Sequence, residues 1–135
     1  MKKTPSFCIY LFAGWVPAAA WCAVIYYISS RPASVLPSGF FPHMDKFAHA
    51  VEFGVLATLS CRAAYWPLSR SEIGRDSLKI PAAVLLFCMI FAALDEFHQI
   101  YVPGRSADWK DWVADVSGAF LAVLLIRFLS RNTRT

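Results

Sequence analysis

Long apolar stretches separated by short polar segments dominate the chain. Residues 4–30 carry no charged side chain, and neither do residues 80–94. Crossing the hydrocarbon core of a bilayer, ~30 Å thick, takes about 20 residues of α-helix. The pattern therefore predicts an all-α polytopic membrane bundle that forms a single domain over residues 1–135. We expect about four transmembrane helices, at about residues 7–29, 45–66, 80–100 and 108–129.

Proline and glycine residues mark the breaks between these helices. Arg31-Pro32 and the prolines at positions 37 and 42 predict a loop that runs to about Met44. Residues 70–79 have the composition of a soluble loop, and residues 101–105 are predicted to form a turn. Pro81 falls in the first turn of the third helix, where a missing backbone N–H costs little.

The composition supports a membrane protein. Apolar residues make up 58% and charged residues 16% of the chain, against roughly 45–50% and 25% in soluble domains. The 13 Lys and Arg residues form no basic stripe, so nucleic acid is not an expected partner. The first apolar stretch is too long for the ~7–15-residue core of a signal peptide, and we expect it to be retained. The four cysteines form no C-x-x-C pair and predict neither disulfides nor a zinc knuckle.

The distribution of Lys and Arg predicts the orientation. Cytoplasmic loops carry an excess of basic residues. Nine basic residues fall at the two chain ends and in the middle loop, and four fall in the other two loops. Both termini should therefore be cytoplasmic. The nine are Lys2, Lys3, Arg62, Arg70, Arg75, Lys79, Arg127, Arg131 and Arg134; the four are Arg31, Lys46, Arg105 and Lys110.

Acidic and histidine residues are concentrated on the opposite, extracytoplasmic side. Seven of the nine carboxylates and all three histidines belong to the outer ends of the predicted helices. Three polar sets there have helical spacing, so each set shares one helix face. We expect these faces to meet in one pocket. The sets are Asp45, His49 and Glu52; Asp95, His98 and Gln99; and Asp108, Asp111 and Asp115.

Charged groups in a membrane segment are costly and usually functional, which makes these residues a candidate site. A simpler account is that some only mark the water boundary, as His43 does after Pro42, or cap a helix, as Asp108 does. Candidate acid–base groups or metal ligands are Asp45, His49, Glu52, Asp95, Glu96, His98 and Asp111. Candidate substrate-binding residues are Lys46, Gln99, Arg105 and Asp115. Magnesium or calcium would suit the carboxylates, and zinc would become possible with the imidazoles.

Common catalytic motifs do not account for these candidate site residues. The chain contains no H-E-x-x-H and no G-x-S-x-G sequence. The spacing of Asp108, Asp111 and Asp115 matches part of a CDP-alcohol phosphotransferase motif, without its glycines and arginine. Pro37-Ser38-Gly39 matches part of a lipid-phosphatase motif, without its histidine.

Three blocks of sequence resemble the VanZ-like membrane proteins. The resemblance extends over about residues 45–125, with Phe53 where many members have Tyr and Asp115 where Asn is common. It implies a small helical bundle in a bacterial plasma membrane, and the family's namesake is associated with resistance to teicoplanin. The blocks are Met44-Asp45-Lys46-x-x-His49-x-x-Glu52-Phe53-Gly54; Asp95-Glu96-x-His98-Gln99 with Val102-Pro103-Gly104-Arg105; and Asp111-x-x-x-Asp115-x-x-Gly118.

We therefore expect a protein that acts at the outer surface of the plasma membrane on cell-envelope lipids or lipid-linked glycans. It could be a hydrolase or transferase of a lipid-linked phosphate or glycan. It could instead bind a headgroup or an antibiotic without turnover. A proton-coupled transporter is the weakest alternative, because the polar groups are confined to one side.

Overall fold

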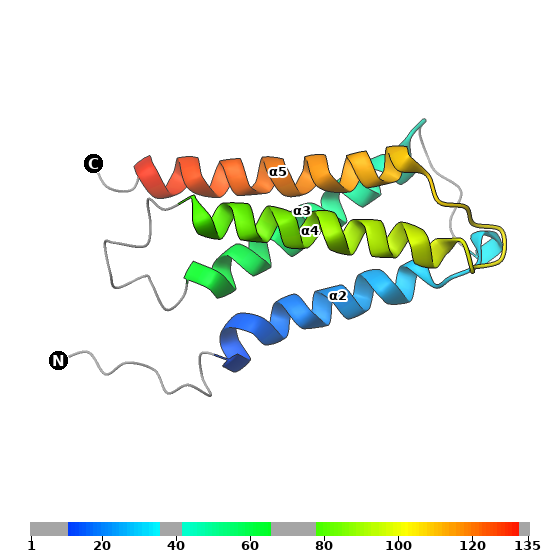
Figure 1. Ribbon diagram of the computed structural model, residues 1–135, viewed down its shortest axis with the longest axis horizontal. Coiled ribbons are helices and arrows are strands. Elements are labelled where there is room, and N and C mark those ends of the chain that lie inside the picture. The colour runs from blue at the N-terminus through cyan, green and yellow to red at the C-terminus, as the bar shows by residue number, and fades with distance from the viewer. Residues whose placement is uncertain (1–10, 36–41, 66–77, 133–135) are drawn as a thin grey trace.

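The computed structural model describes residues 11–35, 42–65 and 78–132, and every regular element in these ranges is helical (Figure 1). This confirms the predicted all-α class. The predicted start of the first helix, Pro37 of the predicted first loop, and most of the middle loop lie outside the described residues. The elements are the π-helical turn η1 (Leu11–Trp15), α2 (Val16–Ser29), the 3₁₀ turn η2 (Ala33–Val35), α3 (Met44–Tyr65), α4 (Lys79–Gln99) and α5 (Trp109–Asn132).

Three helical segments are long and apolar enough to cross a membrane: Phe12–Ser29, Lys79–Gln99 and Trp109–Ser130. The fourth helix, α3, has 22 residues and a length of about 33 Å at 1.5 Å per residue. It matches the others in length but is less apolar, because it carries the charged residues Asp45, Lys46, Glu52 and Arg62. A fourth crossing by α3 stays a prediction.

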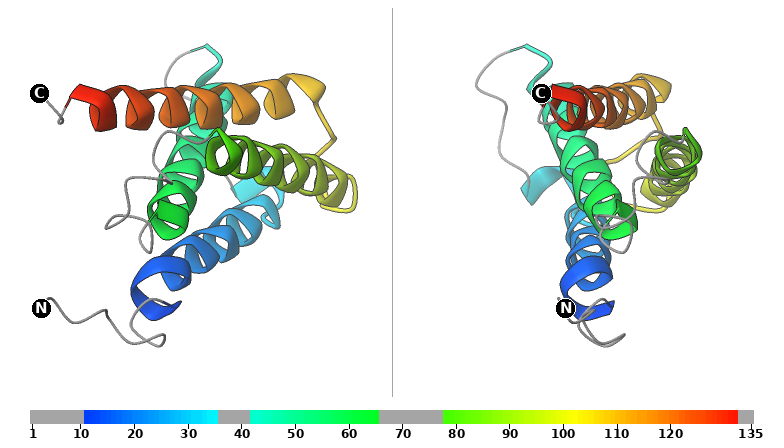
Figure 2. Two further views of the ribbon diagram at one scale, coloured as in Figure 1. Left: turned by 60° about the vertical axis from the view of Figure 1, so that its left-hand side comes forward. Right: turned by 90° about the vertical axis from the view of Figure 1, so that its left-hand side faces the viewer.

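The helix α3 lies at the centre of the bundle, between α5 and α2 (Figure 2). It packs most extensively against α5 and also contacts α2, α4 and η1. The buried core along α3 combines two large residues, Phe53 and Leu56, with small ones such as Ala57 and Cys61. Lys46 and Glu52 of α3 are partly buried against these neighbours, which keeps them away from lipid, whereas Asp45 and Arg62 near the two ends of α3 are exposed.

Glycine permits an unusually close crossing of α3 and α5. A Cβ atom added to Gly118 of α5 would lie 1.9 Å from the backbone oxygen of Ala50 in α3. Small residues at helix crossings let backbones approach in this way, and close packing is a main source of helix association in membranes. The crossing lies within one turn of His49 and Asp115, so it sets the distance between the polar groups of the two helices.

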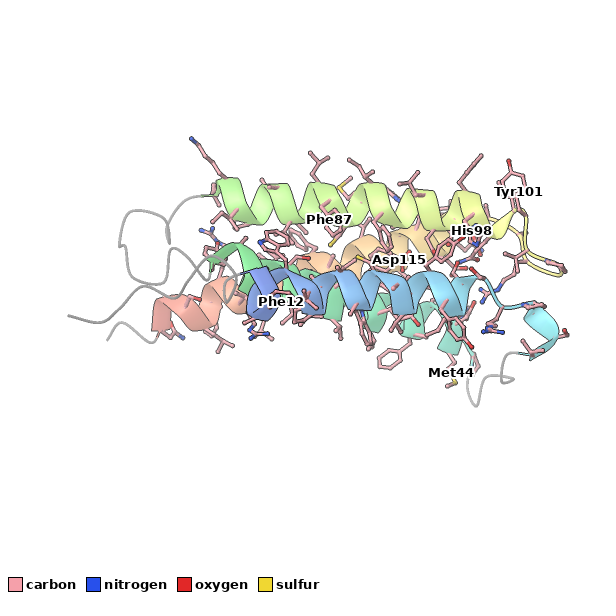
Figure 3. The ribbon with its side chains drawn as sticks, turned by 90° about the horizontal axis from the view of Figure 1, so that it is seen from below. Phe12, Met44, Phe87, His98, Tyr101 and Asp115 are labelled. Carbon is pink, nitrogen blue, oxygen red and sulfur yellow. The ribbon has the colours of Figure 1, made fainter. Side chains whose placement is uncertain are left out.

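The outward faces of α2, α4 and α5 are apolar. Tyr27, Leu86, Leu121 and Phe128 each expose more than half of their surface. In Figure 3, Phe12 lies toward one end of the bundle and His98 and Tyr101 toward the other. Such an exterior suits a hydrocarbon environment, which agrees with the predicted membrane location.

The polar helix ends all lie at one end of the bundle, where α2 and α4 finish and α3 and α5 begin (Figure 1). Gly104 has a φ of 75° and lies in the turn between α4 and α5. Its neighbour Pro103 accepts a hydrogen bond from the backbone N–H of Ala33 at 3.3 Å. The turn is thereby attached to the segment that follows α2, and Arg105 near this turn bonds to the same segment through the backbone oxygen of Arg31.

Candidate functional site

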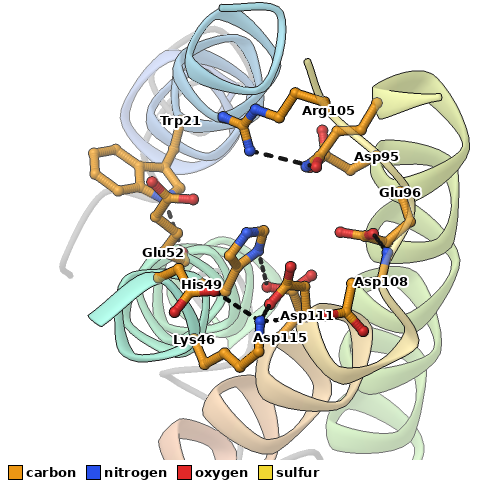
Figure 4. Close-up of polar contacts among 12 residues, drawn as sticks. Trp21, Lys46, His49, Glu52, Asp95, Glu96, Arg105, Asp108, Asp111 and Asp115 are labelled. Carbon is orange, nitrogen blue, oxygen red and sulfur yellow. Dashed lines mark hydrogen bonds and ion pairs between the residues drawn. The ribbon is translucent and has the colours of Figure 1, made fainter. Parts of the chain in front are cut away.

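Side chains from the predicted polar sets come together at this end of the bundle. Figure 4 shows His49, Glu96 and Arg105 pointing toward a common space between the helices. Asp115 lies deeper along the bundle than His98 and Tyr101 (Figure 3). We call the following residues the polar cluster: Lys46, His49, Glu52, Asp95, Glu96, Gln99, Arg105, Asp108, Asp111 and Asp115.

Lys46 links the first turns of α3 and α5. Its Nζ lies 2.5 Å from Asp111 Oδ1, 2.7 Å from Asp45 Oδ2 and 3.3 Å from Asp108 Oδ2. Asp45 exposes 62% of its side chain, so it lies at the edge of the group rather than inside it. Three carboxylates share the charge of Lys46, which leaves it little capacity to bind a further anion.

His49 and Asp115 form the deepest polar contact between α3 and α5. His49 Nδ1 and Asp115 Oδ1 lie 3.0 Å apart, and the Asp115 side chain is 0% exposed. The small separation depends on the close approach of Ala50 and Gly118, which lie within one helical turn of these residues. A buried carboxylate requires a partner of this kind, because burial of an unpaired charge is strongly unfavourable.

Glu96 joins α4 to the beginning of α5. Its Oε2 atom accepts a hydrogen bond of 2.7 Å from the backbone N–H of Asp108. Asp108 in turn accepts from the backbone N–H of Lys110 at 2.9 Å, as a helix-capping residue does. This N–H and the nearby Lys46 ammonium hold the pKa of Asp108 below its usual range. The predicted capping role of Asp108 therefore agrees with its contacts.

Arg105, Gln99 and Asp95 form a chain of hydrogen bonds. Gln99 Nε2 donates to Asp95 Oδ2 at 3.1 Å, and Arg105 Nη1 donates to Gln99 Oε1 at 3.4 Å. Arg105 Nε also donates to the backbone oxygen of Arg31 at 3.4 Å. Asp95 and Gln99 are buried. Within the described residues no carboxylate lies within ion-pair distance of Arg105, so its hydrogen-bond partners are all neutral.

Glu52 and His98 approach the site from α3 and α4, next to α2. Trp21 Nε1 donates to the backbone oxygen of Glu52 at 2.9 Å, which attaches α2 to α3 at this level. His98 Nε2 lies 3.0 Å from Ser30 Oγ, and its ring is 4.6 Å from that of Tyr26. Because the Ser30 hydroxyl gives its one hydrogen to the Tyr26 oxygen, His98 Nε2–H is the donor to Ser30.

Two carboxylate oxygens in the polar cluster are buried without a hydrogen-bond partner among the described residues. They are Glu96 Oε1 and Asp115 Oδ2. His49, Glu96 and Asp115 each offer one ligand atom, and these three atoms lie within 4.8 Å of one another. No other group of three His, Cys, Asp or Glu residues in residues 11–35, 42–65 and 78–132 meets this geometry.

A family model described as VanZ/LLP1 matches residues 7–130. The chain belongs to the VanZ/LLP1 family. The match confirms the resemblance drawn from the three sequence blocks and extends beyond them to the first helix. The chain matches none of the curated proteins and none of the solved structures compared with it. With its membrane-length helices, it is a multi-pass helical membrane protein of the VanZ/LLP1 type.

Some contacts of this VanZ/LLP1 protein could not be read from residue spacing. The predicted set of Asp95, His98 and Gln99 divides, because His98 contacts Tyr26 and Ser30 while the other two lie with Arg105. Ser30 and Tyr26 were not expected near the site. Their position at the outer end of the first predicted helix was the only available signal. The roles of all these residues in binding or catalysis stay predictions.

Proposed function

We propose that this VanZ/LLP1 protein acts at the outer surface of a bacterial plasma membrane on the polar part of a cell-envelope lipid or lipid-linked glycan. The polar cluster would receive the headgroup, while the apolar helix faces keep the lipid tails in the bilayer. Asp95, Glu96, His49 and Glu52 would supply acid–base groups or metal ligands for a hydrolase or transferase reaction.

The observation that carries the proposal is the contrast between the two basic residues of the polar cluster. Lys46 is surrounded by three carboxylates, whereas Arg105 donates hydrogen bonds, among the described residues, only to an amide oxygen and a backbone oxygen. A guanidinium group presents several N–H donors in a plane that matches phosphate or carboxylate geometry. Arg105 is therefore the residue best suited to hold an anionic headgroup.

A lipid-resolved comparison of membranes tests this proposal. Membranes of cells with the wild-type protein, without it, and with the Asp95→Ala variant should be compared at equal protein abundance. We expect at least one envelope lipid or lipid-linked species to change with the wild-type protein alone. A lipid that co-purifies with the protein but does not change in abundance would favour binding without turnover. If no lipid changes in abundance and none co-purifies with the protein, the proposal is wrong.

Arg105→Lys should weaken the function about 10- to 100-fold, the loss expected when charged hydrogen bonds worth ~1.5–3 kcal/mol are removed. An ammonium group cannot keep the contacts to Arg31 and Gln99 while it also holds a headgroup bidentately. The measurement is the lipid change described above, normalised to the amount of protein in the membrane. Arg31→Lys is the matched control, because its backbone oxygen would still accept from Arg105. An equal loss in both variants would contradict the specific role of Arg105.

The proposed orientation gives a separate prediction. In a background without the native cysteines, Ser34→Cys and Ser106→Cys should react in intact cells with a reagent that cannot cross the membrane. A cysteine introduced within residues 69–77 should react only after the membrane is permeabilised. The reason is the excess of Lys and Arg in the middle loop and at the chain ends. Labelling of the middle loop in intact cells would contradict this orientation and would mean that the polar cluster faces the cytoplasm.

A further inference from the structure

We propose that His49, Glu96 and Asp115 bind one divalent cation of the Zn²⁺ or Mn²⁺ type. The three residues come from α3, α4 and α5, so the cation would join the three helices at their polar end. The site can be tested with the metal alone and does not depend on the headgroup proposal. If both hold, the cation would also reduce the negative potential that an anionic headgroup meets.

The first observation is the position of the ligand atoms. One atom from each residue lies within 4.8 Å of the other two. Metal–ligand bonds of about 2.0–2.2 Å place ligand atoms about 3–4 Å apart around one ion. The ligand atoms would therefore need to approach one another by about 1 Å to share an ion.

The second observation is independent of the first and concerns two unpartnered oxygens. Asp115 and Glu96 have relative exposures of 0% and 6%. One oxygen of each carboxylate is occupied: Asp115 Oδ1 by His49 and Glu96 Oε2 by the backbone N–H of Asp108. The other oxygen of each is buried without a hydrogen-bond partner in the part of the chain that the structure describes. Buried polar atoms in native proteins are nearly always satisfied, so these two point to a ligand.

The third observation is the charge balance at this end of the bundle. Seven carboxylates are present, against four Lys and Arg residues. Lys46 is engaged by Asp45, Asp108 and Asp111 and does not contact Glu96 or Asp115. Arg105 also makes no ion pair with them among the described residues. Glu52, Asp95, Glu96 and Asp115 therefore have no Lys or Arg ion pair among the described residues. A cation of charge +2 would compensate two of these four carboxylates, those of Glu96 and Asp115.

The donor set indicates the type of ion. One imidazole and two carboxylates provide mixed nitrogen and oxygen ligands, which suit Zn²⁺ or Mn²⁺ better than Mg²⁺ or Ca²⁺. His49 Nδ1 and Asp115 Oδ1 lie 3.0 Å apart, a separation that two ligands of one ion can have, and the bound metal would replace the proton between them. An anionic ligand is excluded at this position, since it would lie against two carboxylates.

The test uses the full chain, purified in detergent and freed of metal with a chelator. Zn²⁺ and Mn²⁺ are titrated separately, and bound metal is measured by elemental analysis together with the thermal unfolding midpoint. We expect about one ion per chain and a higher midpoint with the ion bound. For Mn²⁺, pulsed electron paramagnetic resonance should detect the nitrogen of one imidazole, and this signal should disappear in His49→Gln.

The variants distinguish a specific metal site from nonspecific attraction of a cation to the negative charge of the polar cluster. Asp115→Asn and Glu96→Gln should each weaken metal binding at least about tenfold, the usual effect of altering a ligand or its direct partner. In Glu96→Gln the amide oxygen can still accept from the Asp108 N–H, so the variant should fold even if Asp115→Asn does not. Asp108→Asn is the matched control: it removes one nearby charge but no ligand, and we expect its affinity to stay within about threefold.

Three outcomes would overturn the proposal. They are no stoichiometric binding of either metal by the wild-type protein, unchanged affinity in Glu96→Gln, or an equal loss in Asp108→Asn. An unpartnered pair of oxygens that shares a proton instead of a metal would give the first of these results. A lipid change in cells combined with no metal binding would refute the cation site and leave the proposed function intact. Metal binding combined with no lipid change and no co-purifying lipid would refute the proposed function and leave the cation site intact.

Discussion

Gly118→Ala should lower the free energy of unfolding by about 3 kcal/mol or more, the upper part of the range for overpacked cores. The added Cβ would lie 1.9 Å from the backbone oxygen of Ala50, a distance that no rotamer change can relieve. The helices α3 and α5 would have to separate. His49 would then move away from Asp115, and the site would lose its deepest contact together with stability. Unfolding in mixed detergent micelles, followed by circular dichroism, measures the effect.

Gly54→Ala is the matched control for this prediction. Gly54 lies at the same crossing, but its added Cβ would be 3.4 Å from the Gly118 oxygen, close to ordinary contact. Alanine is favoured over glycine in a helix by about 0.8–1 kcal/mol. Gly54→Ala should therefore be neutral or slightly stabilising, although it adds the same methyl group. Equal stability of the two variants would mean that the close crossing is absent in the membrane.

Asp95→Asn and Glu52→Gln should each reduce activity at least about a hundredfold, within the range for loss of a general acid or base. Both changes remove ionisation and keep the size of the side chain. Asn at position 95 can still accept a hydrogen bond from Gln99, whose Nε2 donates to Asp95 in the wild type. Stability should change by no more than about 1 kcal/mol, the value of a single hydrogen bond. The measurement is the lipid change assigned to the protein, or teicoplanin susceptibility in a suitable host, at equal membrane abundance.

Asp108→Asn separates function from helix capping. Asp108 lies at the start of α5, bonds to the Lys110 N–H and is half-exposed, so an uncharged Asn can replace it as a cap. We expect this variant to keep most of its activity. If Asp95→Asn and Glu52→Gln also behaved as wild type, the carboxylates would serve only to mark the boundary between membrane and water.

The positions of the helices were predictable because they depend on the hydropathy of each segment alone. A stretch of about 20 apolar residues forms a helix in a bilayer whatever lies beside it, since every backbone polar group must be satisfied within the segment. The predicted 80–100 and 108–129 helices agree with α4 (Lys79–Gln99) and α5 (Trp109–Asn132) within about three residues. The grouping of acidic and histidine residues at one end follows directly from their positions in the sequence, because consecutive helices alternate in direction.

The partners of these polar residues were not predictable, because they depend on how the helices cross. Helical spacing placed Asp45, His49 and Glu52 on one face, yet Asp45 is exposed while His49 reaches Asp115, 66 residues away. Spacing likewise grouped His98 with Asp95, although His98 contacts Ser30, the residue that follows α2. Small rotations of a helix redirect a side chain by several ångströms, and single-helix periodicity carries no information about its neighbours.

The sequence alone therefore determined the membrane class, the helix positions and the end of the bundle that carries the ionisable groups, all of which follow from hydropathy along the chain. Only the tertiary structure decided that Gly118 lets α5 approach Ala50 closely enough for His49 to meet Asp115. It also decided that Glu96 and Asp115 each keep one buried oxygen without a partner among the described residues. Both features arise from contacts between residues far apart in the chain, whose distances are fixed by packing rather than by sequence position.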